Sequence, residues 1–145
     1  RFEWRNKPKV DIVLGNNNIS NIHKLLPGFD FKIHNCVNNM WDFIFNSDIA
    51  FGAGGTSIWE RCCLGLPTIA IAIADNQRFA LERVQKVGGL YHLGFCEEVS
   101  YEQINKAISY LVNDDTNYSS MVCKSLKVCD GYGANRVSHK MLSNS

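Results

Sequence analysis

The sequence predicts an α/β fold in which a Rossmann-like parallel sheet is flanked by helices. The first reason is that short β-branched runs alternate with helical patterns, an order that leads to parallel strands joined by right-handed crossovers. The second reason is residues 68–74 (TIAIAIA), which are apolar without interruption, as expected of a strand covered on both faces. A length of 145 residues and a hydrophobic content of 46% fit a single domain, residues 1–145.

Residues 1–51 contain three predicted strands and two predicted helices. The first strand, KVDIVL, is β-branched and apolar, and it stops at Gly15 and three asparagines, which indicate a turn. A short segment with apolar residues at helical spacing then ends at Pro27. Strands are predicted for residues 9–14, 29–34 and 48–51, and helices for residues 19–26 and 39–45.

The rest of the chain alternates helices with two further strands. One helix opens at Ser57 and is ended by Gly65 and Pro67. Another begins at Ser100, because Ser100 and Gln103 have the spacing of a capping box. Gly131 and Gly133 are expected to separate the last two helices. Strands are predicted for residues 68–74 and 90–93, and helices for residues 57–66, 76–87, 100–112, 117–128 and a last stretch that ends at residue 142.

Charge and hydropathy argue against two classes of partner. The net charge is +1 and there is no basic tract, so we do not expect nucleic acid to bind. No apolar run approaches the ~20 residues of a membrane span. The chain opens with Arg-Phe-Glu-Trp-Arg, which has no leader pattern, so we expect a cytoplasmic protein. The missing initiator methionine suggests a piece of a longer chain.

The cysteines have no spacing that indicates a metal site. No pair shows the CxxC pattern and no histidine lies at a zinc-finger interval, so we expect neither a metal nor a cofactor. Buried, reduced thiols of a cytosolic protein are a better interpretation than disulfides in a domain of this size. The six cysteines are Cys36, Cys62, Cys63, Cys96, Cys123 and Cys129.

The stretch FGAGGTSIWERCCLGLP, residues 51–67, is the most informative part of the chain. It places glycines at the carboxyl end of a predicted strand, where ligands bind in open parallel sheets, and it opens a helix. Glycines let a ligand approach the backbone, and the amino end of a helix attracts anions. The hydroxyls of Thr56 and Ser57 add donors. Together these features favour a phosphate or pyrophosphate.

Other interpretations of the glycines have less support. A dinucleotide-binding fingerprint needs a third glycine at position 57, where Ser57 stands, and the acidic Asp75 follows the next strand instead of ending it. The Walker pattern is absent, because no lysine follows the glycines. A purely structural role, in which the glycines only allow a helix and a strand to pack closely, is a further possibility.

Glu60 has two interpretations. The segment Ser57-Ile58-Trp59-Glu60 fits a capping box, in which the glutamate folds back to the amide of Ser57. Alternatively, the carboxylate accepts hydrogen bonds from the vicinal hydroxyls of a ribose, for which its two oxygens are suited. The residues alone leave both open.

The segment GAGGTSIWERCCLGLPTIAIAIADNQ resembles the carboxyl-terminal half of nucleotide-sugar enzymes of the GT-B architecture. It looks most like the UDP-sugar hydrolase of pseudaminic acid biosynthesis and its relatives in spore-coat polysaccharide biosynthesis. It is similar, more distantly, to the carboxyl-terminal domain of family 28 glycosyltransferases, which add N-acetylglucosamine in peptidoglycan synthesis. With VNNM before it and DGYGANR after it, the resemblance covers roughly residues 10–142.

This resemblance implies a UDP site. The backbone of Val37 would lie beside the uracil, the glycines and hydroxyls would cradle the diphosphate, and Glu60 would hold the ribose. Asn76 would belong to the catalytic cleft in a supporting role, and Gln77 would face the sugar and distal phosphate. The implied UDP-binding residues are Val37, Gly54, Gly55, Thr56, Ser57, Glu60 and Gln77.

The resemblance also implies an activity, the release of UDP from a UDP-2,4-diacetamido-trideoxyhexose. In that family the catalytic histidine lies in a Gly-rich motif of an amino-terminal half, which we expect on another part of the protein or on a partner chain. We therefore interpret His23, His34, His92 and His139 as structural or surface residues. The alternative is the donor-binding domain or separate subunit of a UDP-N-acetylglucosamine-type glycosyltransferase.

Overall fold

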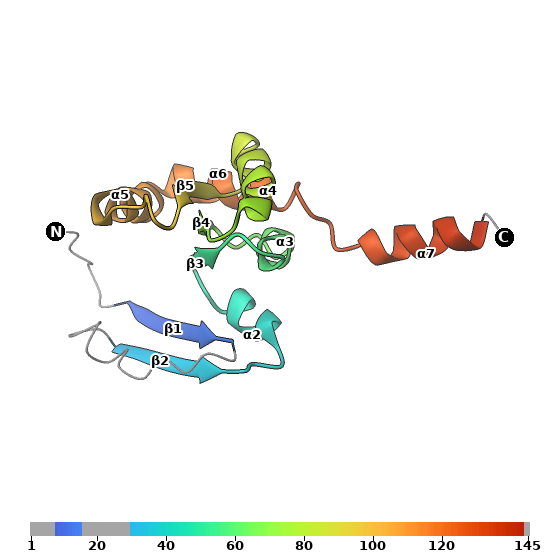
Figure 1. The fold of residues 1–145 in the computed structure, drawn as a ribbon, viewed down its shortest axis with the longest axis horizontal. Coiled ribbons are helices and arrows are strands. Elements are labelled where there is room, and N and C mark those ends of the chain that lie inside the picture. The colour runs from blue at the N-terminus through green and yellow to red at the C-terminus, as the bar shows by residue number, and fades with distance from the viewer. Residues whose placement is uncertain (1–7, 16–29, 144–145) are drawn as a thin grey trace. The chain divides into compact units, whose positions relative to one another are not determined.

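The computed structural model describes residues 8–15 and 30–143 and divides the chain into two compact units (Figure 1). The first unit comprises residues 1–43 and the second comprises residues 44–145. The helix predicted for residues 19–26 lies outside the described residues.

Two parallel strands form the sheet of the first unit. Strand β1 (Lys9–Leu14) pairs with β2 (Asp30–Asn35), and Ile12 lies opposite Ile33. A hydrogen bond of 2.6 Å joins Asp11 to Nε2 of His34 and links the two strands through their side chains. Both strands lie within one residue of their predicted positions. The short helix α2 (Met40–Phe45) follows them in the chain, as predicted.

A three-stranded parallel sheet, in the order β3-β4-β5, forms the centre of the second unit. Its strands are β3 (Ala50–Ala53), β4 (Thr68–Ala72) and β5 (Tyr91–Phe95). Helices flank this sheet, and the predicted α/β, Rossmann-like class is therefore confirmed. The helices of this unit are α3 (Ser57–Cys63), α4 (Asp75–Lys86), α5 (Tyr101–Val112), α6 (Asp115–Ser125) and α7 (Gly133–Ser143).

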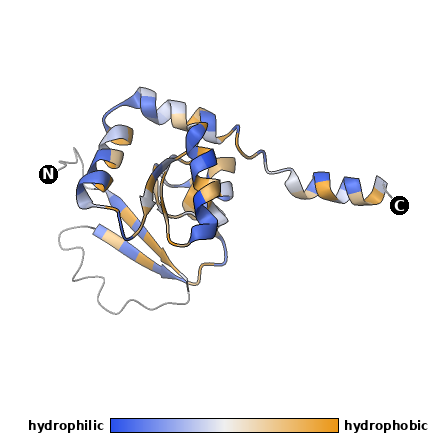
Figure 2. Ribbon diagram, turned by 45° about the horizontal axis from the view of Figure 1, so that its top comes forward, coloured by the Kyte–Doolittle hydropathy of each residue, from blue (hydrophilic) through white to orange (hydrophobic). Residues whose placement is uncertain are grey.

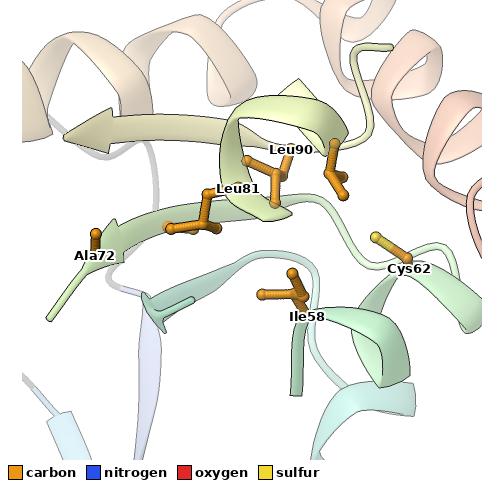
Figure 3. Close-up of a cluster of buried hydrophobic side chains, with 7 residues drawn as sticks. Ile58, Cys62, Ala72, Leu81 and Leu90 are labelled. Carbon is orange, nitrogen blue, oxygen red and sulfur yellow. The ribbon is translucent and has the colours of Figure 1, made fainter. Parts of the chain in front are cut away.

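The central strand β4 sends its side chains into two separate apolar clusters. Ala70 and Ala72 pack with residues of α3 and α4, and Figure 3 shows Ile58, Cys62 and Leu81 of this cluster. On the other face the cluster consists of Ile69, Ala107, Leu111 and Met121, which come from β4, α5 and α6. A strand buried on both faces reads as a continuous apolar run, which explains the composition of residues 68–72. In Figure 2 the ribbon at the centre of the second unit, between its helices, is coloured mostly hydrophobic.

Several predicted boundaries need correction. β3 begins and ends two residues later than predicted, because β4 offers partners as far as the Ala53–Ile71 pair. Helix α3 ends at Cys63, where Leu64 caps it and Gly65 adopts φ +70°. β4 ends at Ala72, because the next amide, that of Ile73, is bonded by the Gln77 side chain at 3.0 Å.

The capping box predicted for α5 is present. Ser100 accepts a hydrogen bond from the amide of Gln103, and the Gln103 side chain accepts one from the amide of Ser100. Gly133, by contrast, does not interrupt the chain but is the first residue of α7, a helix whose described side chains are all exposed. None of the helices in the described residues has the length and apolar character that a membrane crossing requires.

The prediction of buried cysteines is only partly right. Cys62 is buried, but Cys36, Cys96 and Cys123 are exposed, and the six cysteines form no disulfide with one another. Two of the exposed thiols, Cys36 and Cys96, lie one residue beyond the ends of β2 and β5, and the third, Cys123, lies on α6. At such positions, apolar neighbours in the sequence do not predict that a cysteine is buried.

Candidate functional site

The glycine-rich turn lies between β3 and α3, at the carboxyl edge of the sheet. Its first residue, Gly54, continues the pairing of β3, since its amide donates to the carbonyl of Ile71 on β4 at 2.9 Å. The helical bonding begins with the amide of Ile58, which donates to the carbonyl of Gly55 at 3.1 Å. The turn therefore consists of residues 54–56, and the structure brings the predicted glycines and hydroxyls together as neighbours on one short connection.

The two glycines of the turn have different environments. An ideal Cβ at Gly54 would lie 2.3 Å from Cδ1 of Leu81, so helix α4 packs directly against this backbone. A Cβ at Gly55 would meet nothing within 4 Å. Gly54 is needed for close packing between α4 and the turn, whereas Gly55 presents bare backbone to open space.

The amides of this turn also differ. The Gly54 amide is used in the sheet, which corrects its expected role as a donor to phosphate; its contribution is steric. Within the described residues, the amides of Gly55, Thr56 and Ser57 donate no backbone hydrogen bond. These three amides are the donors that a ligand could use.

The capping box predicted for Ser57 and Glu60 is not formed. Thr56, one residue earlier, is the N-cap of α3, and no side chain hydrogen bond caps this helix. Glu60 is instead exposed, one turn into the helix. A capping role therefore does not explain why a glutamate stands at position 60, and the ribose interpretation stays a prediction.

Arg61 is a residue that the sequence did not indicate, and its side chain bonds the residues on both sides of the turn. It is only 9% exposed, and its Nη2 donates to Oγ of Ser57 and to the carbonyl of Ala53, the latter at 3.3 Å. Burial lowers the pKa of this guanidinium below its ordinary value. The one sequence feature that indicates a contact between Ser57 and Arg61 is their spacing, since residues four apart are neighbours on one helical face.

Helix α4 begins at the neighbouring strand end. β4 lies beside β3, and α4 starts at Asp75, so Asn76 and Gln77 lie in its first turn. Asn76 is exposed. The side-chain oxygen of Gln77 accepts a hydrogen bond from the amide of Ile73, and its side-chain nitrogen could donate to a ligand.

The remaining predicted residues lie elsewhere. Val37 follows β2 in the first unit and is half-buried. Of the histidines, His23 lies outside the described residues, and His34 bonds Asp11 within the first unit. His92 lies on β5, where burial lowers its pKa, and His139 is exposed on α7. In the described ranges, no cluster of three or more His, Cys, Asp or Glu residues could hold a metal ion.

Two hollows of the second unit have linings that differ from the predicted site. One, of about 390 Å³, lies around the start of β5 and includes Tyr91 and Tyr110. The other, of about 480 Å³, is an apolar groove beside Trp59, rimmed by cations. The groove is lined by Trp59, Arg83, Val84, Val87, Lys124, Lys127 and Val128. Trp59, which lies on α3 three residues after the turn, is part of the lining of the second hollow.

Comparison with known proteins adds no assignment. No protein-family model matches this sequence, and the search of curated proteins gives no significant match.

Proposed function

We propose that this chain is the UDP-binding part of a UDP-sugar hydrolase that acts in surface polysaccharide biosynthesis of the pseudaminic acid type. The observation that carries the proposal is the turn of residues 54–56 together with Ser57, the first residue of α3, which presents three neighbouring amides and two hydroxyls at the carboxyl end of β3. Oriented N–H and O–H donors without an acceptor of their own suit a diphosphate.

In the hydrolysis of a UDP-sugar, this chain would have a supporting role. In this reaction, a water oxygen forms a bond to the anomeric carbon, the bond from that carbon to the diphosphate oxygen breaks, and UDP leaves. A base accepts the proton of the water, and donors stabilise the charge that grows on the diphosphate. The turn would supply the donors, and Asn76 would line the cleft. The base would come from an amino-terminal half, in this protein or in a partner chain.

A glycosyltransferase of the same architecture is the second candidate. It would use the same UDP-sugar site, but a sugar hydroxyl would replace water as the nucleophile. Product analysis separates the two candidates: the hydrolase releases UDP and free sugar in buffer alone, whereas the transferase releases UDP only with an acceptor.

A titration of the full 145-residue chain tests the proposal. In NMR spectra, UDP should shift the amide signals of Gly55, Thr56 and Ser57, with a dissociation constant of about 0.1–1 mM, which corresponds to about 4–5.5 kcal/mol. Uridine, which lacks the diphosphate, should leave these signals unchanged. Equal binding of UDP and uridine would show that the turn does not recognise phosphate.

A further inference from the structure

Arg61 places a positive charge in the interior of the second unit. Its side chain is nine-tenths buried, and among the described residues it takes part in no ion pair. Its Nη1 is inaccessible to solvent and, within the part of the chain that the structure describes, has no hydrogen-bond partner. A buried charge is costly unless it is paired, so a nearby anion would stabilise this guanidinium.

The guanidinium lies against the start of the glycine-rich turn. A Cβ at Gly52 would be 3.7 Å from both Nη1 and Nη2, so the group rests on the backbone of β3. Nη2 donates to the two residues that flank the turn, to the carbonyl of Ala53 and to the hydroxyl of Ser57. The charge is therefore held at the strand end, although Arg61 belongs to the second turn of α3.

The bond to Ser57 fixes what its hydroxyl can do. A serine hydroxyl has one proton to donate and two lone pairs that accept. Because Nη2 of Arg61 occupies a lone pair, the hydroxyl proton has to point away from the guanidinium. Hydrogen bonds from a charged donor are strong, and a hydroxyl that accepts one becomes a better donor itself.

We propose that Arg61 is a positioning residue for anion recognition, which orients the Ser57 hydroxyl as a donor to a phosphate group and places positive charge behind the turn. This inference rests on the proposed function in one respect, that the anion is the diphosphate of a nucleotide. The competing explanation is that Arg61 only ties α3 to β3.

Binding of inorganic pyrophosphate, UDP and uridine to the full chain and to four variants distinguishes these explanations. The variants are Arg61→Met, Arg61→Lys, Ser57→Ala and the double variant Ser57→Ala/Arg61→Met. Arg61→Met removes the charge and keeps an unbranched chain, so pyrophosphate and UDP should bind about ten-fold more weakly or worse, the usual effect of losing a charge-assisted hydrogen bond. Arg61→Lys should restore part of this loss, because it restores the charge.

The double variant tests the coupling. If Arg61 acts partly through Ser57, the double variant should bind pyrophosphate more tightly than the product of the two single losses predicts. Thermal unfolding of every variant shows whether it is folded, and Arg61→Lys and Ser57→Ala carry the test if Arg61→Met does not fold. A folded Arg61→Met chain, or a folded Ser57→Ala chain, that binds pyrophosphate like the native chain would overturn the inference. Losses that combine without coupling would overturn the link through Ser57.

The choice of ligands separates this inference from the proposed function. If the native chain binds pyrophosphate through Arg61 but binds UDP no more tightly, Arg61 serves an anion site and the nucleotide proposal fails. If UDP binds and the Arg61 variants bind it unchanged, the nucleotide proposal stands and the inference about Arg61 fails. A native chain that binds neither ligand contradicts both.

Discussion

Leu81 of α4 occupies the space that a side chain at Gly54 would need. The nearest atom, Leu81 Cδ1, would be 2.3 Å from an ideal Cβ at that glycine, closer than non-bonded carbons approach each other. Leu81 is fully buried and belongs to the cluster that packs between β4, α3 and α4 (Figure 3). The turn at the proposed site is therefore supported from behind by the core of the second unit.

The first prediction follows from this contact. Gly54→Ala should destabilise the chain by about 1–3 kcal/mol, the usual cost of overpacking a core, because either Leu81 or the turn has to move. Gly55→Ala is the matched control: its Cβ meets no atom within 4 Å, and its φ is not positive. Urea unfolding of the three chains measures the difference. Equal stabilities of the two alanine variants would contradict the packing described above.

A second prediction concerns the capping box of α5. Ser100→Ala removes the acceptor for the amide of Gln103 and should cost about 0.5–2 kcal/mol of unfolding free energy. Ser100→Asp keeps an acceptor at the same position and should retain most of the stability. Thermal or urea unfolding measures both. If alanine and aspartate behave alike, the hydrogen bond at Ser100 contributes nothing measurable.

The two S-x-x-[EQ] patterns in this chain show what could be predicted from sequence and what could not. At Ser100 the pattern forms the expected box, because all its partners lie within four residues. At Ser57 the same pattern does not form it, because the helix is capped one residue earlier and Arg61 bonds the hydroxyl. That guanidinium lies beside Gly52 and donates to the carbonyl of Ala53, both on β3, and the register of β3 depends on β4.

The difference between local partners and partners distant in the chain also explains the other predictions that agree or disagree with the structure. Within the described residues, the order of strands and helices agrees with the prediction, because it follows from periodicity and local turn residues. A local pattern cannot predict contacts with residues at least 15 positions away in the chain. Such contacts determine where β3 ends, why the Gly54 amide bonds to β4, and why Gly54 packs against Leu81. The turn was therefore predicted as a location, while the roles of its individual groups required the structure.

A third prediction concerns alkaline pH. Burial raises the pKa of the Cys62 thiol from 9.0 to about 11. In the unfolded chain the thiol loses its proton near pH 9, whereas in the folded chain it keeps the proton until about pH 11. The unfolded state thus binds fewer protons in this window, and the stability that is fully present below pH 9 falls as the pH rises towards 11, by about 1–3 kcal/mol.

A comparison of variants isolates this effect from other titrating groups. Unfolding free energies of the native chain, Cys62→Ala and Cys123→Ala should be measured at pH 8 and at pH 10.5. Cys62→Ala should lose less stability between the two pH values than the native chain does. Cys123 is exposed, so Cys123→Ala should keep the native response. An unchanged response in Cys62→Ala would mean that this thiol titrates alike in both states.

The last prediction concerns Glu60, whose exposed carboxylate does not cap α3. If it holds the ribose diol of a bound nucleotide, Glu60→Gln should weaken UDP binding by about 1–2 kcal/mol, or roughly 5- to 30-fold, because an amide keeps only one acceptor oxygen. Stability should change by less than about 0.5 kcal/mol, as at most exposed positions. Glu102→Gln, which neutralises a carboxylate in the first turn of α5, is a control for net charge.

Removing a hydroxyl from the ligand identifies the group that Glu60 contacts. The native chain should bind 2′-deoxy-UDP more weakly than UDP, because the carboxylate loses one of its two hydrogen-bond donors. In Glu60→Gln this difference between the ligands should shrink, since most of the interaction is already lost. Isothermal titration of both ligands into both chains gives the four affinities that this comparison needs. If removing the 2′-hydroxyl costs the same factor with and without the carboxylate, Glu60 does not contact the ribose, and its exposed position on α3 needs another explanation.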